Sequence, residues 1–222
     1  MSDDLVRVLL VEDQTVFREA LVVALEREPD VEVTGHVGSI AEARACLAGA
    51  PVDVAVTNLE LPDGHCSTLI RDLRRACPLV QVLILTETTD RYDLGEAVSA
   101  GAAGVLHTTA PLTEIVSAVR RLCAGQPIVE PTELVRLLRL AEERRAQQQS
   151  TRTALARLTP REREVLVALG QGLSDREIAQ QLHVGRETVH SHMVHMLHKL
   201  DVESRLQALI FAIKHGVVHL GT

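Results

Sequence analysis

The first 124 residues alternate short apolar runs with amphipathic stretches, and this alternation restricts the possible folds most strongly. The apolar runs, rich in Val, Leu and Ile, are Val6–Val11, Val31–Val37, Val52–Thr57, Val80–Leu85 and Gly104–His107. The stretches with helical spacing are Thr15–Arg27, Ile40–Ala48, Ser67–Ala76, Arg91–Ala100 and Leu112–Ala124. Strands that are apolar on both faces and separated by helices form a parallel sheet covered by helices on both sides. We therefore predict a doubly wound α/β domain, (βα)₅, over residues 1–124.

Polar residues follow several of the predicted strands, at the edge where doubly wound folds place their chemistry. Glu12 and Asp13 come after the first strand, and Asn58 after the third. Thr86 and Thr108 follow the fourth and fifth strands. An alternative is that the acidic pair consists of solvated loop charges and that Thr86 is a structural hydroxyl. The strand-end residues nevertheless define the candidate site of this domain.

The motifs around these residues carry a resemblance to a known family. They are V-E-D ending at Asp13, D-V-x-V-x-N-L-x-L-P-D-G ending at Gly64, L-I-L-T ending at Thr86 and G-A-x-G-V-L ending at Leu106. Together they resemble the response-regulator receiver domain over roughly residues 5–124. The resemblance implies two acids that hold Mg²⁺ and an aspartate after strand three that accepts a phosphoryl group. It also implies a Ser/Thr hydroxyl and a lysine that hold the transferred group.

Four positions depart from the receiver pattern in this pocket. Asn58 stands at the acceptor position, and a neutral carboxamide is too poor a nucleophile to form an acyl phosphate. Thr108 replaces the lysine and supplies no fixed positive charge to phosphoryl oxygens. Glu87 stands where a small residue is usual, and Val105 stands where an aromatic residue is usual. We therefore predict a degenerate phosphoacceptor pocket in a protein that works without aspartyl phosphorylation and is not an enzyme.

The charge balance of the altered pocket is compatible with a folded domain. Loss of the acceptor carboxylate and of the lysine leaves Glu12 and Asp13, so the net charge resembles that of the usual pocket. Two carboxylates and a backbone carbonyl form a weak Mg²⁺ site, and we predict no tightly bound metal or cofactor. The domain is expected to act as a scaffold that dimerises or binds another molecule. Gating by a ligand in place of phosphate remains an alternative.

The stretch Leu158–Ile213 predicts a second, all-α domain of four helices, assigned to residues 156–222. Ser174 is followed three residues later by Glu177, the capping-box pattern that starts a helix, here Asp175–Leu182. A turn with a glycine able to adopt a positive φ, His183–Gly185, leads to a helix over Arg186–Leu200. The flanking helices start at Thr159-Pro160 and at Ser204. For the last helix, we expect these residues to face inward: Leu206, Leu209, Ile210 and Ile213.

Several motifs in this stretch occur together at defined spacings. They are L-T-P-R-E-R-E-V-L, G-x-S-x-x-E-I-A-x-x-L, T-V-x-x-H and K-L-x-V-x-S-R. The stretch resembles the LuxR-type helix-turn-helix output domain of NarL/FixJ-type response regulators. The resemblance implies a transcription factor whose recognition helix, Arg186–Leu200, enters the DNA major groove. The alternative is a generic four-helix module that binds proteins.

The resemblance also implies candidate DNA-binding residues. Base contacts fall on His190, Ser191 and Val194, of which His190 stands where the family most often has lysine. The other candidates, which contact the phosphate backbone, are Arg186, Thr188, His192, Lys199 and Arg205. For His192, packing against the scaffold is an alternative. Dimers of such domains read inverted half-sites, so we expect a homodimer on double-stranded DNA with a partly palindromic operator. A heterodimer with a related regulator remains an alternative, as does an interaction protein that binds little DNA itself.

Residues 125–155 are predicted to link the two domains. Glu133–Arg145 has the apolar spacing of an amphipathic helix, and the polar stretch Gln147–Thr151 predicts a flexible tether. Charge divides along the chain, with 14 basic and 23 acidic residues in positions 1–150, but 9 and 7 in positions 151–222. An acidic regulatory domain joined to a weakly basic DNA-facing domain fits this division.

The remaining features concern the cellular compartment. No apolar segment follows the acidic start Met1–Asp4, which argues against a secretory signal, and no run of about 18 apolar residues could span a membrane. The four cysteines show neither C-x-x-C nor zinc-ligand spacing, and we expect reduced thiols at Cys46, Cys66, Cys77 and Cys123. We therefore expect a cytoplasmic protein.

Overall fold

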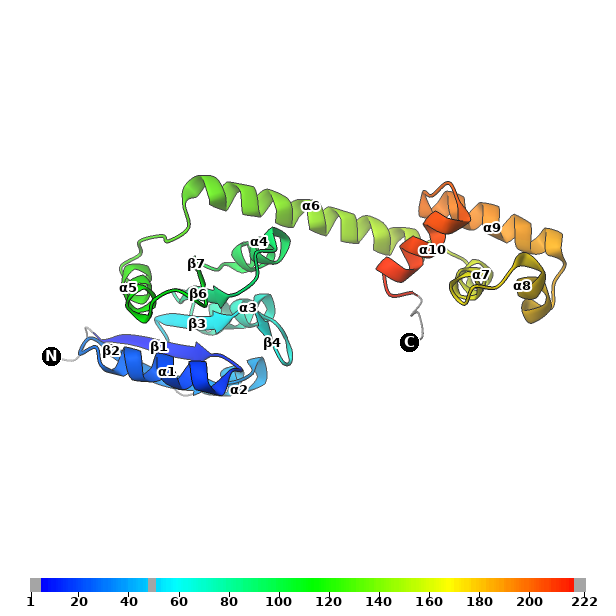
Figure 1. Cartoon of the computed structure of the whole chain (residues 1–222). Helices are drawn as coiled ribbons and strands as arrows, with labels where there is room; N and C mark the ends of the chain where they lie inside the picture. Colours follow the sequence, from blue (N-terminus) through cyan, green and yellow to red (C-terminus); the bar gives the residue numbers. More distant parts are fainter. Residues whose placement is uncertain (1–4, 48–50, 218–222) are drawn as a thin grey trace. The chain divides into compact units, whose positions relative to one another are not determined.

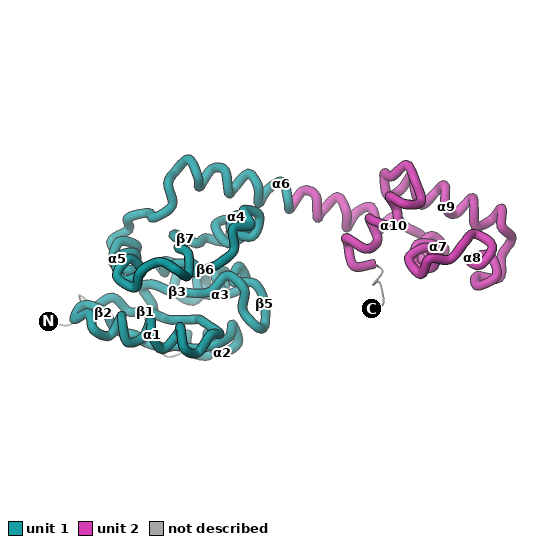
Figure 2. Tube along the Cα trace, viewed as in Figure 1, with its two compact units in different colours: residues 1–144 teal, residues 145–222 magenta. Residues whose placement is uncertain are grey.

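The structure, a computed structural model, describes residues 5–47 and 51–217. The predicted acidic start Met1–Asp4 and the predicted helix end at Ala48 lie outside the described residues. The chain forms two compact units, residues 1–144 and 145–222 (Figure 2). This division falls inside one long helix, so both units share the segment predicted as a linker. The domain limits 1–124 and 156–222 stay predictions.

A five-stranded sheet forms the centre of the first unit (Figure 1). Its strands are β1 (Val6–Val11), β2 (Val31–Val37), β3 (Val54–Asn58), β6 (Gln81–Thr86) and β7 (Gly104–His107). They are parallel throughout, in the order β2-β1-β3-β6-β7, so the predicted doubly wound fold is confirmed. A small antiparallel hairpin, β4 (Glu60–Leu61) with β5 (Gly64–His65), follows β3. The predicted strands agree with these bounds to within a few residues.

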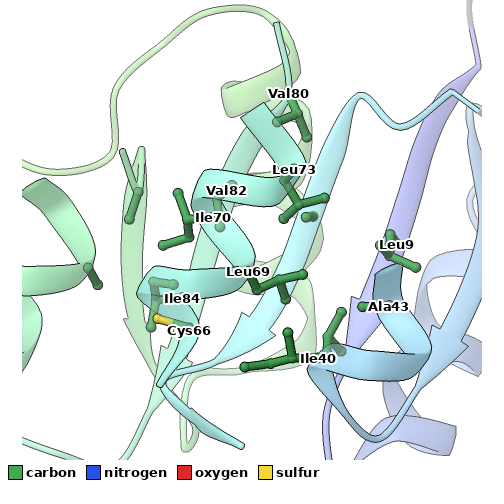
Figure 3. Packing of buried hydrophobic residues seen from close by; sticks show 14 of the residues in the cluster. Leu9, Ile40, Ala43, Cys66, Leu69, Ile70, Leu73, Val80, Val82 and Ile84 are labelled. Carbon is green, nitrogen blue, oxygen red and sulfur yellow. The ribbon is translucent and has the colours of Figure 1, made fainter. Parts of the chain in front are cut away.

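Two separate apolar cores cover the two faces of this sheet. The helices that surround it are α1 (Thr15–Glu26), α2 (Ile40–Cys46), α3 (Cys66–Ala76), α4 (Arg91–Ala100) and α5 (Leu112–Cys123). On one face, α2, α3 and α4 pack on alternate strand residues, with Leu9, Leu69 and Ile84 fully buried (Figure 3). On the other face, α1 and α5 pack on the intervening strand residues. Aliphatic side chains buried on both faces explain why the strands read as continuous apolar runs.

Helix α6 (Pro131–Ala156) continues through the stretch that was predicted to be a flexible tether. Gln147–Thr151 is helical throughout, so that prediction is wrong. The reason is intrinsic propensity, because the glutamines of this stretch and the alanines and arginines that flank it favour a helix even without an apolar stripe. Among the described residues, no helix is long and apolar enough to cross a membrane.

The second unit contains the four predicted short helices. They are α7 (Pro160–Gly170), α8 (Asp175–Leu182), α9 (Arg186–Leu200) and α10 (Arg205–Lys214). Predicted core residues such as Val165, Ile178 and Met196 are fully buried. The structure therefore confirms an all-α helix-turn-helix unit in addition to the α/β unit.

The predicted orientation of α10 is wrong for two of its residues. Ala208 and Ala212 are fully buried, whereas Leu206 is 64% exposed and Ile210 is 54% exposed. Small side chains at these positions let α10 lie close against α7 and α9, which turns the larger side chains on the opposite face outward. Helix α10 therefore presents an apolar surface, Leu206 with Ile210, to the exterior of its unit.

Candidate functional site: the strand-end pocket and the recognition helix

Asn58 lies at the carboxyl end of β3, and both ends of its amide are engaged. Its Nδ2 donates to Asp13 Oδ1 at 3.3 Å, and its Oδ1 accepts a hydrogen bond from the Leu59 amide at 2.7 Å. Residue 57 of β3 pairs with the last residue of β1, which brings Asn58 beside the acidic pair. The carboxamide therefore occupies the acceptor position as a hydrogen-bonding group that joins the two strand ends.

Glu12 and Asp13 differ sharply in their surroundings. Glu12 is 3% exposed, and its Oε1 accepts a hydrogen bond from the Gln14 amide at 2.9 Å, whereas Asp13 is exposed. Burial raises the pKa of Glu12; the Gln14 amide opposes that shift, and the neighbouring Asp13 carboxylate adds to it, leaving the pKa above its usual value. The alternative that both acids are solvated loop charges therefore does not describe Glu12.

An arginine that the sequence motifs did not reveal lies at the same strand end. Arg18, from α1, donates a hydrogen bond through Nη1 to the backbone carbonyl of Glu12. A side chain on Gly38 would place its Cβ 3.3 Å from this Nη1, so Gly38 leaves room for the guanidinium. In the sequence, only the six-residue separation between Glu12 and Arg18 indicated this contact. That separation does not distinguish Arg18 from other surface residues of α1.

The geometry of this pocket does not fit a tightly held Mg²⁺. The ion prefers carboxylate and carbonyl oxygens arranged as an octahedron. At Asn58 the amide oxygen is directed to the Leu59 amide, and the nitrogen faces Asp13. A hydrogen-bond donor therefore stands where a third oxygen ligand would be needed.

The remaining pocket residues lie along the ends of β6 and β7. Thr86 is buried, and its Oγ1 accepts a hydrogen bond from the Thr88 amide at 3.1 Å, which supports the structural role considered for it. The Thr108 Oγ1 is buried and has no hydrogen-bond partner among the described residues. Glu87 is exposed. Val105 lines a cavity of about 380 Å³ together with Thr86 and with residues of α4 and α6.

The helix-turn-helix is fixed by local capping interactions. Ser174 and Glu177 form the predicted capping box at the start of α8. The predicted use of the turn glycine is wrong, because Gly185 has φ −72° and caps α9, whereas His183 adopts the left-handed conformation with φ 58°. A histidine tolerates this region better than a β-branched residue does. The sharp turn therefore depends on His183, directly after α8.

One face of α9 is exposed in the part of the chain that the structure describes. Most of the predicted DNA-binding residues on this helix are exposed, namely Arg186, Thr188, His190, Ser191 and Val194. His192 is half-buried, consistent with the packing role considered for it. The opposite side of α9 buries Val189, Met193, Met196 and Leu200. The helix therefore presents a mainly polar surface of suitable size for a DNA groove.

Lys199 is engaged inside the unit. Its Nζ lies 2.8 Å and 2.7 Å from the two carboxylate oxygens of Glu162, whose side chain is 4% exposed. Glu162 also completes the capping box of α7 with Thr159. Burial alone would raise the pKa of Glu162, but the hydrogen bonds from Lys199 and Thr159 hold it below its usual value.

Arg205 is similarly engaged, through Asp175 at 2.7 Å and the Leu173 carbonyl. Phosphate contact by Lys199 and Arg205 stays a prediction, and any such contact would compete with these internal partners. The structure thus gives both residues a role as braces of the helix-turn-helix.

Comparison with known families assigns both units. Residues 8–120 match the response regulator receiver domain, and residues 156–212 match the bacterial regulatory proteins of the luxR family. The chain belongs to the LuxR-type response regulators. Membership of this family places it among DNA-binding regulators of transcription.

Individual LuxR-type response regulators resemble the chain along nearly its whole length. The DNA-binding transcriptional activator DevR/DosR of Mycobacterium tuberculosis is 36% identical over 94% of this chain and 94% of its own. The response regulator VraR of Staphylococcus aureus is 30% identical over 96% of this chain and 99% of its own. A solved structure of the response regulator RcsB from Salmonella typhimurium has a TM-score of 0.53, covers 94% of this chain and 98% of its own, and is 22% identical, which supports the fold alone.

Proposed function

We propose that the chain is a sequence-specific transcriptional regulator that works without aspartyl phosphorylation. The observation that carries this proposal is the state of Asn58, whose amide is neutral and hydrogen-bonded at both ends. Neither end of this group offers the carboxylate oxygen needed to attack a phosphoryl donor. Thr108, at the position of the family's lysine, provides a hydroxyl instead of a cation.

The exposed face of α9 is the proposed DNA-reading surface. Val194 can contact a thymine methyl group, and His190 and Ser191 can hydrogen-bond to base edges in the major groove. Arg186 and Thr188, at the start of the helix, are suited to contact the phosphate backbone. Since the exposed face carries few cations, we expect modest phosphate contact per subunit and a correspondingly small dependence of affinity on salt.

Treatment with a phosphodonor tests the first part of the proposal. We expect wild-type protein incubated with acetyl phosphate and Mg²⁺ to gain no phosphoryl group by intact-mass measurement. Its affinity for a selected operator should change by less than about twofold, because the pocket lacks the nucleophile. The Asn58→Asp, Thr108→Lys double variant restores both missing groups and serves as the comparison. A phosphorylated wild-type protein with altered DNA affinity would overturn the proposal.

We propose that two copies pair through α10 on a partly palindromic operator. Leu206 and Ile210 lie one turn apart and form an exposed apolar surface, which is typical of a contact with a second helix. The Leu206→Glu, Ile210→Glu variant should be a monomer in sedimentation. Its affinity for the full operator should fall by about tenfold or more, because linked binding to two half-sites is lost.

The same variant separates this proposal from its alternative. Binding to an isolated half-site should be unchanged, because Leu206 and Ile210 lie outside the proposed reading surface on α9. If wild-type protein is monomeric and binds no selected DNA, the apolar surface of α10 would instead favour a heterodimer with a related regulator.

A further inference from the structure

At Gly95, helix α4 approaches the backbone of the first half of α6 more closely than a residue with a Cβ would allow. A Cβ on Gly95, in the interior of α4, would lie 2.5 Å from the Leu137 carbonyl oxygen and 3.4 Å from the Ala141 nitrogen. Leu137 and Ala141 are each only 3% exposed. Glycine in a helix interior is less favourable than alanine, and the close approach of the two backbones accounts for its presence here.

Two ion pairs join the helices, and on α6 they lie on both sides of the Leu137 and Ala141 contact with Gly95. Arg91 Nη2 lies 2.5 Å from Glu133 Oε1, and Asp93 Oδ1 lies 2.5 Å from Arg144 Nη1. The two pairs connect residues far apart in sequence. The cation belongs to α4 in the first pair and to α6 in the second. A packed backbone contact flanked by two matched charge pairs defines a specific interface, which we name the α4–α6 seam.

The seam borders the altered phosphoacceptor pocket. The cavity of about 380 Å³ lined by Thr86 and Val105 is also lined by Arg91 and Glu133, the first ion pair of the seam. Val105 stands at the position where the receiver family usually has an aromatic residue. The start of α6 therefore lies across a single cavity from Thr86 and Val105, two residues of the altered pocket.

We propose that the first half of α6 is a built-in cover for the α4 face and that this cover prevents two copies from pairing across α4. The uncovered face would be self-complementary. Arg91 and Asp93 carry opposite charges two residues apart on α4, so a two-fold arrangement could place Arg91 of one copy against Asp93 of the other. A second α4 and the chain's own α6 therefore compete for the same two charges.

Amide hydrogen exchange of the full-length chain tests whether the seam exists in solution. In wild-type protein, residues 134–144 should exchange slowly, at rates close to those of the neighbouring core. Gly95→Ala should increase exchange in this segment by about tenfold or more while leaving strand β3 protected. Alanine is the best helix former, so α4 itself is not weakened by this change. Unchanged exchange in Gly95→Ala would overturn the proposed cover.

Charge reversal provides an independent test with its own rescue. Arg144→Asp should increase exchange in residues 134–144, because two aspartates would then face each other. The Asp93→Arg, Arg144→Asp double variant restores an opposite-charge pair and should restore slow exchange. If the double variant exchanges as fast as the single variant, the ion pair does not hold the cover.

Self-association tests the second half of the proposal, separately from DNA binding. Sedimentation is measured in the Leu206→Glu, Ile210→Glu background, so that pairing through α10 does not contribute. Adding Gly95→Ala should strengthen self-association by about tenfold, because a larger fraction of molecules would expose α4. Adding Arg91→Asp as well should abolish this gain. Faster exchange without stronger association would overturn the claim that α6 prevents pairing. None of these readouts depends on phosphorylation or on the operator.

Discussion

Val194→Glu should lower the affinity of the chain for its operator by about 100-fold, through loss of a methyl contact and repulsion from DNA phosphates. Val194 is 49% exposed on α9 and makes no contribution to the core of its unit. Glutamate favours a helix at least as well as valine does, so the free energy of unfolding should change by less than about 0.5 kcal/mol. Electrophoretic mobility shifts with a selected operator, together with urea unfolding, measure both quantities.

A matched control separates the effect of position 194 from the effect of an added negative charge. Leu79→Glu introduces the same charge at a residue that is 88% exposed in the first unit, and it should leave DNA affinity unchanged. If Val194→Glu binds as tightly as wild type, the exposed face of α9 is not the reading surface. The interaction-protein alternative would then become the better explanation of this chain.

Lys199→Met should destabilise the second unit by about 3 kcal/mol, because it leaves the Glu162 carboxylate buried without its partner. Methionine keeps most of the apolar length of the lysine stem, so the loss reports mainly the missing charge. Circular dichroism during urea unfolding measures the change. Arg161→Met removes the exposed pair with Glu164, whose side chains are 55% and 44% exposed, and should cost at most about 0.5 kcal/mol.

The pH dependence of this effect has a definite sign. The folded-state pKa of Glu162 is lowered, so its ionised form stabilises the unit above the unfolded pKa of about 4.3, and this stabilisation is lost as pH falls through the folded pKa. The difference between wild type and Lys199→Met should therefore shrink as the solution is acidified below about pH 4. A difference that stays constant from neutral to acid pH would show that the pair does not stabilise the unit electrostatically.

The periodic elements of this chain could be predicted because their signals are local. Apolar runs gave the strands of the sheet, and the pattern Ser174 to Glu177 gave the start of α8. The orientation of α10 could not be predicted in this way, since Ala208 and Leu206 are both compatible with burial until the neighbouring helices are known. The helical continuity of α6 was missed for a different reason, because the absence of an apolar stripe was given more weight than the helix propensity of its glutamines.

In the candidate site, too, local features could be predicted from the sequence and long-range contacts could not. The identity of Asn58 was sufficient to predict a pocket without a nucleophile, but the direction of its amide depends on Asp13 and on the Leu59 amide. The partners of Lys199 and Arg205 lie 37 and 30 residues away in sequence, so no local pattern could identify them as internal braces. Long-range electrostatic pairing is therefore the part of the site that required coordinates.

The position of Tyr92 has a practical consequence for spectroscopy. The chain contains one tyrosine and no tryptophan, so its intrinsic ultraviolet emission comes from Tyr92. This ring lies at the start of α4, with the guanidinium carbon of Arg144 6.0 Å from its centre. Departure of α6 would remove that cation from a ring that is already 44% exposed. The natural protein therefore carries a fluorophore at the contact between α4 and α6, and its emission can be followed in real time without any label.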